Sequence, residues 1–146
     1  MVITFPTNTD ETIRAIRGVI GRDIYMNITV TTSGCSLCGY DPVNNASKDP
    51  FCSGCGGLYW IPITEDISES GHVRWYPFDE ARYEHGGAVF DGDCIVTIAY
   101  TSGNLENVRR ANYFLVDGMK MTMDKYTLRG VPQLNRIRIF LREDGR

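Results

Sequence analysis

The chain has 146 residues, which is enough for one ordinary domain and too few for two, so we expect a single domain over residues 1–146. Hydrophobic residues make up 42% of the chain and charged residues 23%, a balance that excludes an intrinsically disordered protein. The net charge of −3 argues against a strongly basic nucleic-acid-binding surface, and no apolar run approaches the roughly 20 residues of a membrane span.

A short helix is predicted near the start of the chain. Asn8 can cap it, with Glu11 as the reciprocal partner of a capping box. Ile13, Ile16 and Ile20 then recur at helical spacing, and the glycine that follows is a natural end. We expect this apolar stripe to pack on the core of the domain itself rather than to remain exposed for a partner.

The next segment, residues 23–32, alternates between apolar and polar side chains and therefore predicts a half-buried strand. Its apolar positions are Ile24, Met26, Ile28 and Val30. Residues 33–57 then change to Gly, Ser, Asn, Asp and Cys, with little apolar content. We interpret residues 33–61 as a loop-rich insert within the domain, which needs an external staple to be ordered.

Further strands are predicted along the rest of the chain. The first two lie at 58–63 and 72–78, and a third at 93–100 follows a polar stretch over 79–92. A helical turn or two is expected at 104–111. Because several short strands follow one helix, the predicted fold class is mostly β: a small antiparallel barrel or sandwich with an N-terminal helix and an inserted zinc ribbon.

The pair Asp117-Gly118 separates two strand-like runs, 113–116 and 119–128. Both turn positions tolerate the positive φ of a tight hairpin, so we predict one here.

The last strand, 134–141, has two chemically different faces. Isoleucine and leucine occupy one face and arginine the other, with the residues Ile137, Ile139 and Leu141 against Arg136, Arg138, Phe140 and Arg142. Burying three arginines in one small core would cost too much, so the isoleucine face must point inward.

Four of the five cysteines form two C-x-x-C pairs, Cys35 with Cys38 and Cys52 with Cys55. Because the first residues of the chain show no secretory signal, we expect a reducing cytoplasm, where clustered cysteines more often bind metal than form disulfides. The spacing is that of a four-thiolate zinc site. Four thiolates would close the coordination, so the predicted Zn²⁺ is structural and has no open position for a substrate.

Two other interpretations of these cysteines stay open: simple reduced or disulfide-paired residues, and an iron site of the rubredoxin kind. A glycine follows each pair, at Gly39 and Gly56, where a left-handed backbone is expected as the chain wraps around the metal. In such a turn, backbone N–H groups point at the sulfurs. Cys94 lies apart in a predicted strand and is interpreted as a small buried hydrophobe.

No catalytic site is predicted. The only histidines, His72 and His85, do not neighbour a nucleophile motif, and the chain has no phosphate-binding glycine loop. The acidic residues of the stretch 79–92 are interpreted as a solvated loop. A cytoplasmic zinc-ribbon module that binds nucleic acid or a regulatory protein is the alternative function, although Lys48 is the only basic residue between Cys35 and Trp60.

The ribbon resembles one found in small neck proteins of tailed bacteriophages, known as head-completion, head-to-tail adaptor or stopper proteins. Its first half has the form Cys-x-x-Cys-x-x-Asp-Pro, which here runs from Cys35 to Pro42. Its second half, Pro-Phe-Cys-x-x-Cys-x-Gly, runs from Pro50 to Gly57. The C-terminal half is similar to the stopper barrel in three segments, residues 92–96, 113–119 and 136–141.

This resemblance implies a structural virion protein without catalytic activity, assembled in the host cytoplasm and located in the neck. It implies a homo-oligomeric ring with the portal or adaptor protein above and a tail-terminator or tail protein below. Double-stranded DNA would pass without sequence-specific binding, and the ring would retain packaged DNA. Many stopper barrels lack a zinc ribbon, so stopper, adaptor and tail terminator all stay open. In a ring, we expect at least one of Arg136, Arg138 and Arg142 to form a salt bridge between subunits.

Overall fold

The computed structural model describes residues 9–76, 83–84, 87–88, 92–131 and 133–144. Three features of the sequence lie outside these residues: the helix cap at Asn8, His85, and most of the polar stretch 79–92. Within the described residues the chain is mostly β, with a closed six-stranded antiparallel barrel and a short N-terminal helix, as the sequence predicts.

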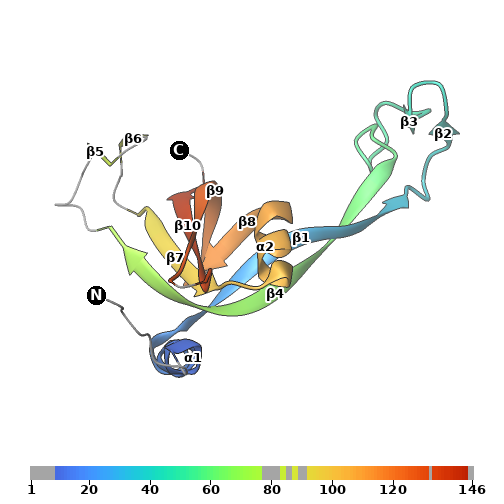
Figure 1. Cartoon of the computed structure of the whole chain (residues 1–146). Coiled ribbons are helices and arrows are strands. Elements are labelled where there is room, and N and C mark those ends of the chain that lie inside the picture. Colours follow the sequence, from blue (N-terminus) through green and yellow to red (C-terminus); the bar gives the residue numbers. More distant parts are fainter. Residues whose placement is uncertain (1–8, 77–82, 85–86, 89–91, 132, 145–146) are drawn as a thin grey trace. The chain divides into compact units, whose positions relative to one another are not determined.

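The elements follow one another along the chain as shown in Figure 1. Their bounds are α1 Thr9–Ile20, β1 Arg22–Gly34, β2 Tyr40–Asp41, β3 Ala46–Ser47, β4 Trp60–Trp75, β5 Tyr83–Glu84, β6 Gly87–Ala88, β7 Cys94–Ala99, α2 Ser102–Arg110, β8 Ala111–Val116, β9 Met119–Arg129 and β10 Arg136–Glu143. The barrel closes in the order β1-β4-β7-β10-β9-β8, and each of the pairs β2-β3 and β5-β6 forms a small sheet of its own.

The chain divides into two compact units. The first, which we call the barrel unit, comprises residues 1–27 and 66–146, and the second, the cysteine unit, comprises residues 28–65. The cysteine unit contains the predicted insert at 33–61 together with residues of the two long strands β1 and β4 on either side of it.

The core of the barrel unit comes from the inward-facing side chains of its strands and from one side chain of α2. Twelve residues form this buried cluster: Ile24, Met26, Cys94, Val96, Ile98, Val108, Phe114, Val116, Met121, Ile137, Ile139 and Leu141. Alternation along β10 places Ile137, Ile139 and Leu141 inside, each 0–1% exposed, which confirms the predicted orientation of that strand. Cys94 is 1% exposed in this core and is a buried hydrophobe, as predicted.

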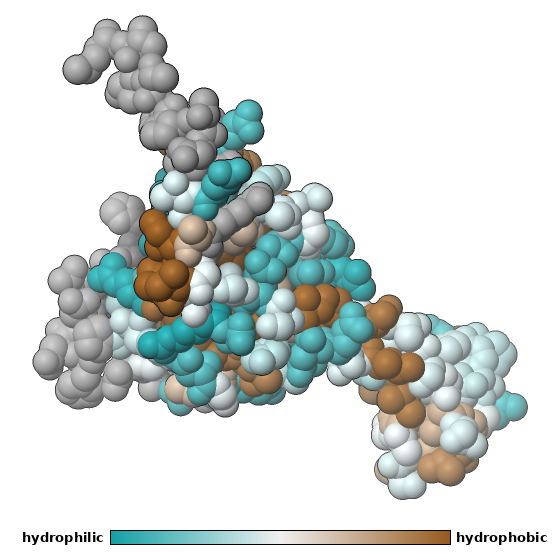
Figure 2. Space-filling view, turned by 90° about the horizontal axis from the view of Figure 1, so that it is seen from below, coloured by the Kyte–Doolittle hydropathy of each residue, from teal (hydrophilic) through white to brown (hydrophobic). Residues whose placement is uncertain are grey.

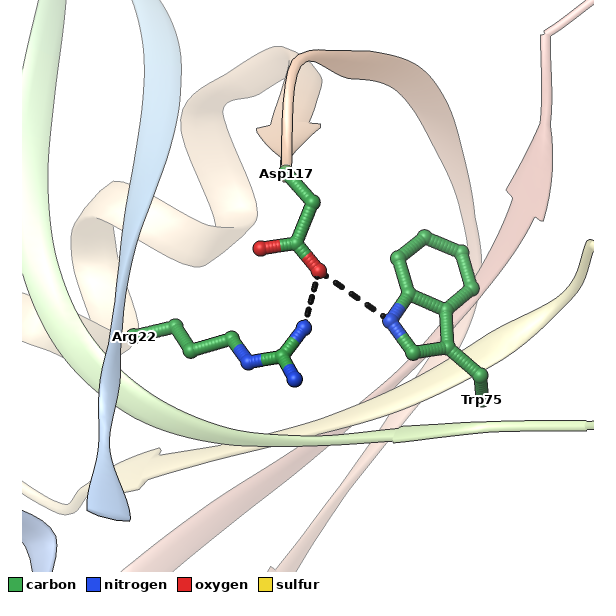
Figure 3. Close-up of polar contacts among 3 residues, drawn as sticks. All are labelled: Arg22, Trp75 and Asp117. Carbon is green, nitrogen blue, oxygen red and sulfur yellow. Dashed lines mark hydrogen bonds and ion pairs between the residues drawn. The ribbon is translucent and has the colours of Figure 1, made fainter.

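The predicted hairpin between β8 and β9 is confirmed. Asp117 has φ 51° and Gly118 has φ 80°, the two positive values that a tight turn with the right-handed twist of the strands requires. The Asp117 carboxylate also binds two residues far away in the sequence. It accepts hydrogen bonds from the Arg22 guanidinium and from Trp75 Nε1, the latter at 3.2 Å, so the turn is tied to the start of β1 and the end of β4 (Figure 3).

A buried asparagine provides a second polar connection in the barrel unit. Asn27 is 6% exposed, and its Nδ2 donates to Asp66 Oδ1 at 2.7 Å. Its Oδ1 accepts from Asn112 Nδ2 at 3.1 Å. Because both ends of the Asn27 amide are paired, a buried polar side chain is tolerated on a strand whose neighbours Met26 and Ile28 are apolar.

Two predictions about the elements are wrong. Of the predicted runs 58–63 and 72–78, residues 77 and 78 lie outside the described residues, but residues 60–63 and 72–75 belong to one strand, β4, which continues through the polar residues between them. These residues are mostly exposed, so they lack the apolar alternation from which a half-buried strand is recognised. The apolar stripe of α1 does not pack on the core either, since Ile16 is 52% and Ile20 54% exposed. The strands and Val108 of α2 already fill the barrel interior.

The turn expected at 104–111 is the helix α2. Thr101 caps it, because its hydroxyl accepts from the backbone N–H of Asn104 at 3.0 Å, and Arg109 and Arg110 lie in the last turn, where basic residues are favoured. Among the described residues, no helix is both long and apolar enough to cross a membrane.

Candidate metal centre

The structure brings the four predicted ligands together. Cys35 follows the last residue of β1, and Cys38 comes shortly before β2. Cys52 and Cys55 lie in the turns between β3 and β4. The four Sγ atoms all lie within 4.8 Å of one another, and this group could hold a metal ion.

The distances between the sulfurs fit one tetrahedral ion. Cys35 Sγ and Cys52 Sγ are 3.8 Å apart, and Cys38 Sγ and Cys55 Sγ are 3.5 Å apart. A tetrahedron with metal–sulfur bonds of about 2.3 Å has edges of about 3.8 Å. No disulfide joins these residues, because all five cysteines of the chain are free thiols. Each close pair takes one sulfur from each C-x-x-C motif, so the two motifs face each other across the site.

The ligands are unequally covered. Cys35 is 6% and Cys52 5% exposed, whereas Cys38 and Cys55 are half-buried. In the cysteine unit the only other buried residues are Ile28 and Ser47. The sulfurs therefore occupy the place that apolar side chains take in an ordinary core.

Backbone amides support the thiolate of Cys55, as the sequence predicts for such turns. Its pKa is lowered to about 6: burial opposes the shift, but hydrogen bonds from the N–H groups of Tyr59 and Gly57 and from the Cys38 thiol outweigh it. The largest single influence on the pKa of Cys38 is the Ser47 hydroxyl, which lowers it, but burial and the three neighbouring thiols together outweigh this and raise the pKa to about 12. A second negative charge beside the first is unfavourable until a cation neutralises both.

Several backbone hydrogen bonds hold the loop in place around the sulfurs. The Cys35 N–H donates to the Tyr59 carbonyl at 2.9 Å, and the Gly56 N–H donates to the Cys52 carbonyl at 2.8 Å. The Ser47 N–H donates to the Gly57 carbonyl at 3.0 Å, which joins β3 to the second cysteine turn. These bonds fix the backbone of both motifs in the conformation that points their sulfurs at one another.

Three glycines follow the two cysteine pairs, and the reason for glycine differs between the positions. Gly56 has φ 56°, as predicted for the residue after a cysteine pair. Gly57 has φ 88°, and a Cβ there would lie 2.7 Å from the Pro50 carbonyl oxygen. The same prediction is wrong for Gly39, which has no positive φ. There a Cβ would instead press against the Lys48 side chain at 3.2 Å.

Sequence analysis missed an aromatic cluster beside the metal centre. The rings of Tyr40, Tyr59 and Trp60 pack in tilted and edge-to-face arrangements, with centroids 4.9–5.7 Å apart. Asn45 Oδ1 accepts from the Tyr40 hydroxyl at 2.7 Å and from Trp60 Nε1 at 3.3 Å. Tyr59 has φ 69°, a value that costs energy for a residue with a Cβ. Its N–H and carbonyl both bind the cysteine motifs, which explains why this conformation is held.

The other candidate residues, Cys94 and His72, belong to the barrel unit. Cys94 is in the barrel core, where burial, and to a smaller extent Asp93 and Asp117, raise its pKa to about 12. His72 lies exposed on β4. Across the described parts of the chain, the four cysteines are the only group of potential metal ligands found. Comparison of the chain with protein-family models, with curated proteins and with solved structures found no match.

Proposed function

We propose that this chain is a structural, non-enzymatic protein of the neck of a tailed bacteriophage, where identical copies form a ring between portal and tail. The observation that carries the proposal is the combination of a closed six-stranded barrel with a four-cysteine loop between β1 and β4. The resemblance of the ribbon and barrel motifs to neck proteins implies the same combination. Double-stranded DNA would pass through the ring without sequence-specific contacts, and the ring would help to retain packaged DNA.

The proposed ion is one Zn²⁺ per chain, held by Cys35, Cys38, Cys52 and Cys55. Four thiolates leave no position for water or substrate, so the ion contributes folding energy to the loop and no chemistry. Iron would take the same four ligands. Elemental analysis of protein purified under reducing conditions distinguishes the two, and we expect about one zinc and no iron per chain. Protein without bound metal would contradict this part of the proposal.

The charge of the cysteine unit also supports a role other than nucleic-acid recognition. Residues 28–65 contain Lys48 against Asp41, Asp49 and Glu65, so this unit has a net charge of 1 − 3 = −2. Binding to a phosphate backbone depends on several basic side chains, and this unit has only Lys48. A zinc-ribbon module for nucleic acid is therefore the weaker alternative.

Native mass spectrometry tests the proposed function. We expect the purified chain to form a large homo-oligomer or to co-assemble when mixed with the portal protein encoded by the same genome. A chain that stays monomeric with the portal protein, and that instead retards a nucleic-acid duplex in a gel, would support the alternative. Virions of the source phage, analysed by protein mass spectrometry, should contain the chain in ring-like copy number relative to portal.

A further inference from the structure

Three arginines lie on the outer face of the barrel, and none of them has a carboxylate partner among the described residues. The strand register pairs Arg136 of β10 directly with Arg129 of β9, and Arg138 lies two residues further along the same face. Directly opposite residues of antiparallel strands point to the same side, where like charges are destabilising. In the described part of the chain none of the three forms an ion pair, whereas Arg142 is paired with Asp124 at 3.2 Å. We call Arg129, Arg136 and Arg138 the arginine face.

The arginine face also has an apolar component. The guanidinium carbon of Arg138 lies 5.5 Å from the centroid of the Phe140 ring, which is half-buried on the same side of β10. An arginine over an aromatic ring keeps hydrogen-bond donors available at the edge of its guanidinium. The surface therefore offers guanidinium donors beside an aromatic ring. Arginine and aromatic residues are both enriched at protein interfaces.

The cysteine unit contains a β ribbon with two exposed faces. Its strands are residues 30–34 of β1 and 60–65 of β4, where all side chains except Ser33 and Ile61 are exposed. Successive residues of a strand point to opposite faces, so exposure of whole runs means that neither face is covered. Val30 is 49% and Ile63 47% exposed. An isolated two-stranded ribbon without a covered apolar face is only marginally stable in water, so burial of this one against a partner surface would be favourable.

The charge of this β ribbon is opposite to that of the arginine face. Glu65 lies on the exposed part of β4, and among the described residues it has no ion pair. The cysteine unit has no arginine and a net charge of −2. One molecule thus carries an exposed acidic surface with apolar residues and, in its barrel unit, a basic surface beside the half-buried Phe140, whose ring Lys125 Nζ also approaches to 4.9 Å from the centroid.

We propose that the β ribbon of one copy docks on the arginine face of a second copy of this chain. Glu65 pairs with the arginine face, and Val30 and Ile63 pack towards Phe140. Pairing relieves the repulsion between Arg129 and Arg136, because a carboxylate between two guanidinium groups binds both. The contact joins two different surfaces, so each copy of a bound pair keeps its other surface free and the contact repeats in a closed ring or an open chain. This proposal deepens the ring of the proposed function and rests on it.

Charge-reversal variants test the contact in solution. Glu65→Arg and Arg136→Glu should each weaken self-association at least about tenfold, measured by sedimentation velocity over a range of protein concentrations. The double variant Glu65→Arg/Arg136→Glu should recover to within about threefold of the unchanged chain, because the charges are exchanged rather than removed. Glu106→Arg, at an exposed position of α2, is the matched control and should associate normally. Metal content and circular dichroism should be the same in all four variants.

A mixture of the two single variants gives a further check. In the mixture the two intact surfaces complement each other, and so do the two reversed surfaces, so the mixture should regain the assembly that each single variant lacks on its own. The proposal is overturned if the single variants assemble like the unchanged chain, if the double variant is no better than either, or if the unchanged chain is monomeric at every concentration. If the chain still bound the portal protein after one of these outcomes, the proposed neck function would remain supported although this contact was not. Loss of DNA-duplex binding in Arg136→Glu with normal assembly would overturn the proposal in favour of a nucleic-acid contact.

Discussion

The barrel unit and the cysteine unit solve the same folding problem by different means. In the barrel unit twelve side chains, each at most 1% exposed, form a continuous core. In the cysteine unit the large apolar side chains face outward instead, with Leu37, Val43, Phe51 and Leu58 between 69% and 91% exposed. Figure 2 shows such apolar side chains on the surface of this unit, at the right of the view. Apolar burial therefore holds the barrel, whereas the cysteine unit depends on its four sulfurs.

The largest expected effect comes from the same substitution made in both units. Phe114 is fully buried and Phe51 is 91% exposed. Phe114→Ala should lower the free energy of unfolding of the barrel by about 3–5 kcal/mol, because a core cavity remains. Phe51→Ala should change it by less than about 0.5 kcal/mol. Urea unfolding followed by near-ultraviolet circular dichroism measures both. Equal effects would contradict the contrast between the two units.

A glycine of the barrel unit should be the next most sensitive position. A Cβ at Gly71 would lie 2.5 Å from Ile24 Cδ1 and 2.9 Å from Ile98 Cγ2. Gly71→Ala should therefore overpack the core and destabilise the protein by about 1–3 kcal/mol. Gly103→Ala, at an exposed position of helix α2, should instead be neutral or stabilising by up to about 1 kcal/mol. The unfolding temperatures of the two variants test this contrast. An unchanged unfolding temperature in Gly71→Ala would mean that the barrel is packed more loosely around this glycine.

The β8–β9 turn should respond to the side chain placed at Gly118. Gly118→Val should cost more than about 1 kcal/mol, because a β-branched residue resists the positive φ of this position. Gly118→Asn should cost less, since asparagine tolerates that conformation. Neither variant should lose metal, because the turn belongs to the barrel unit. If valine and asparagine had the same unfolding midpoint as glycine, the turn geometry would be wrong.

The smallest expected effect concerns a surface ion pair of the barrel unit. Lys120 Nζ lies 2.9 Å from Asp144 Oδ2, and this contact lowers the pKa of Asp144 below its usual 3.8. A carboxyl with a lowered pKa in the folded state adds stability above pH 3.8, and this is lost as the pH falls through the folded pKa. Lys120→Gln should return the pKa of Asp144 towards 3.8, measured by NMR titration, with almost no change in stability because both groups are exposed. An unchanged pKa would exclude the ion pair in solution.

The sequence was most informative where function or a turn depends on residues close together in the chain. The four cysteines, the Asp117-Gly118 turn and the two faces of the strand around Ile137 could all be predicted from spacing alone. Each of these signals depends on local chemistry: thiolates at metal-binding spacing, a pair that tolerates positive φ, and alternation along a strand.

The features that could not be predicted depend on contacts between distant residues. Asp117 binds Arg22 and Trp75, which are 95 and 42 positions away, so no local pattern marks them. Gly71 is required by Ile24 and Ile98, which reach it only once the barrel has closed. The apolar stripe of α1 was predicted, but its exposure was not. Amphipathic spacing shows that a helix has an apolar face, but it does not show whether the core has room for that face.

The central claim is that one metal ion orders residues 28–65 while the barrel folds without it. Hydrogen exchange of the zinc-loaded protein and of the same protein treated with a chelator under reducing conditions tests this claim most directly. We predict that chelation releases about one zinc per chain and abolishes protection at residues 35–59, while the amides of β7, β9 and β10 keep theirs. Loss of protection throughout the barrel, or unchanged protection around the cysteines after the metal is gone, would contradict the account.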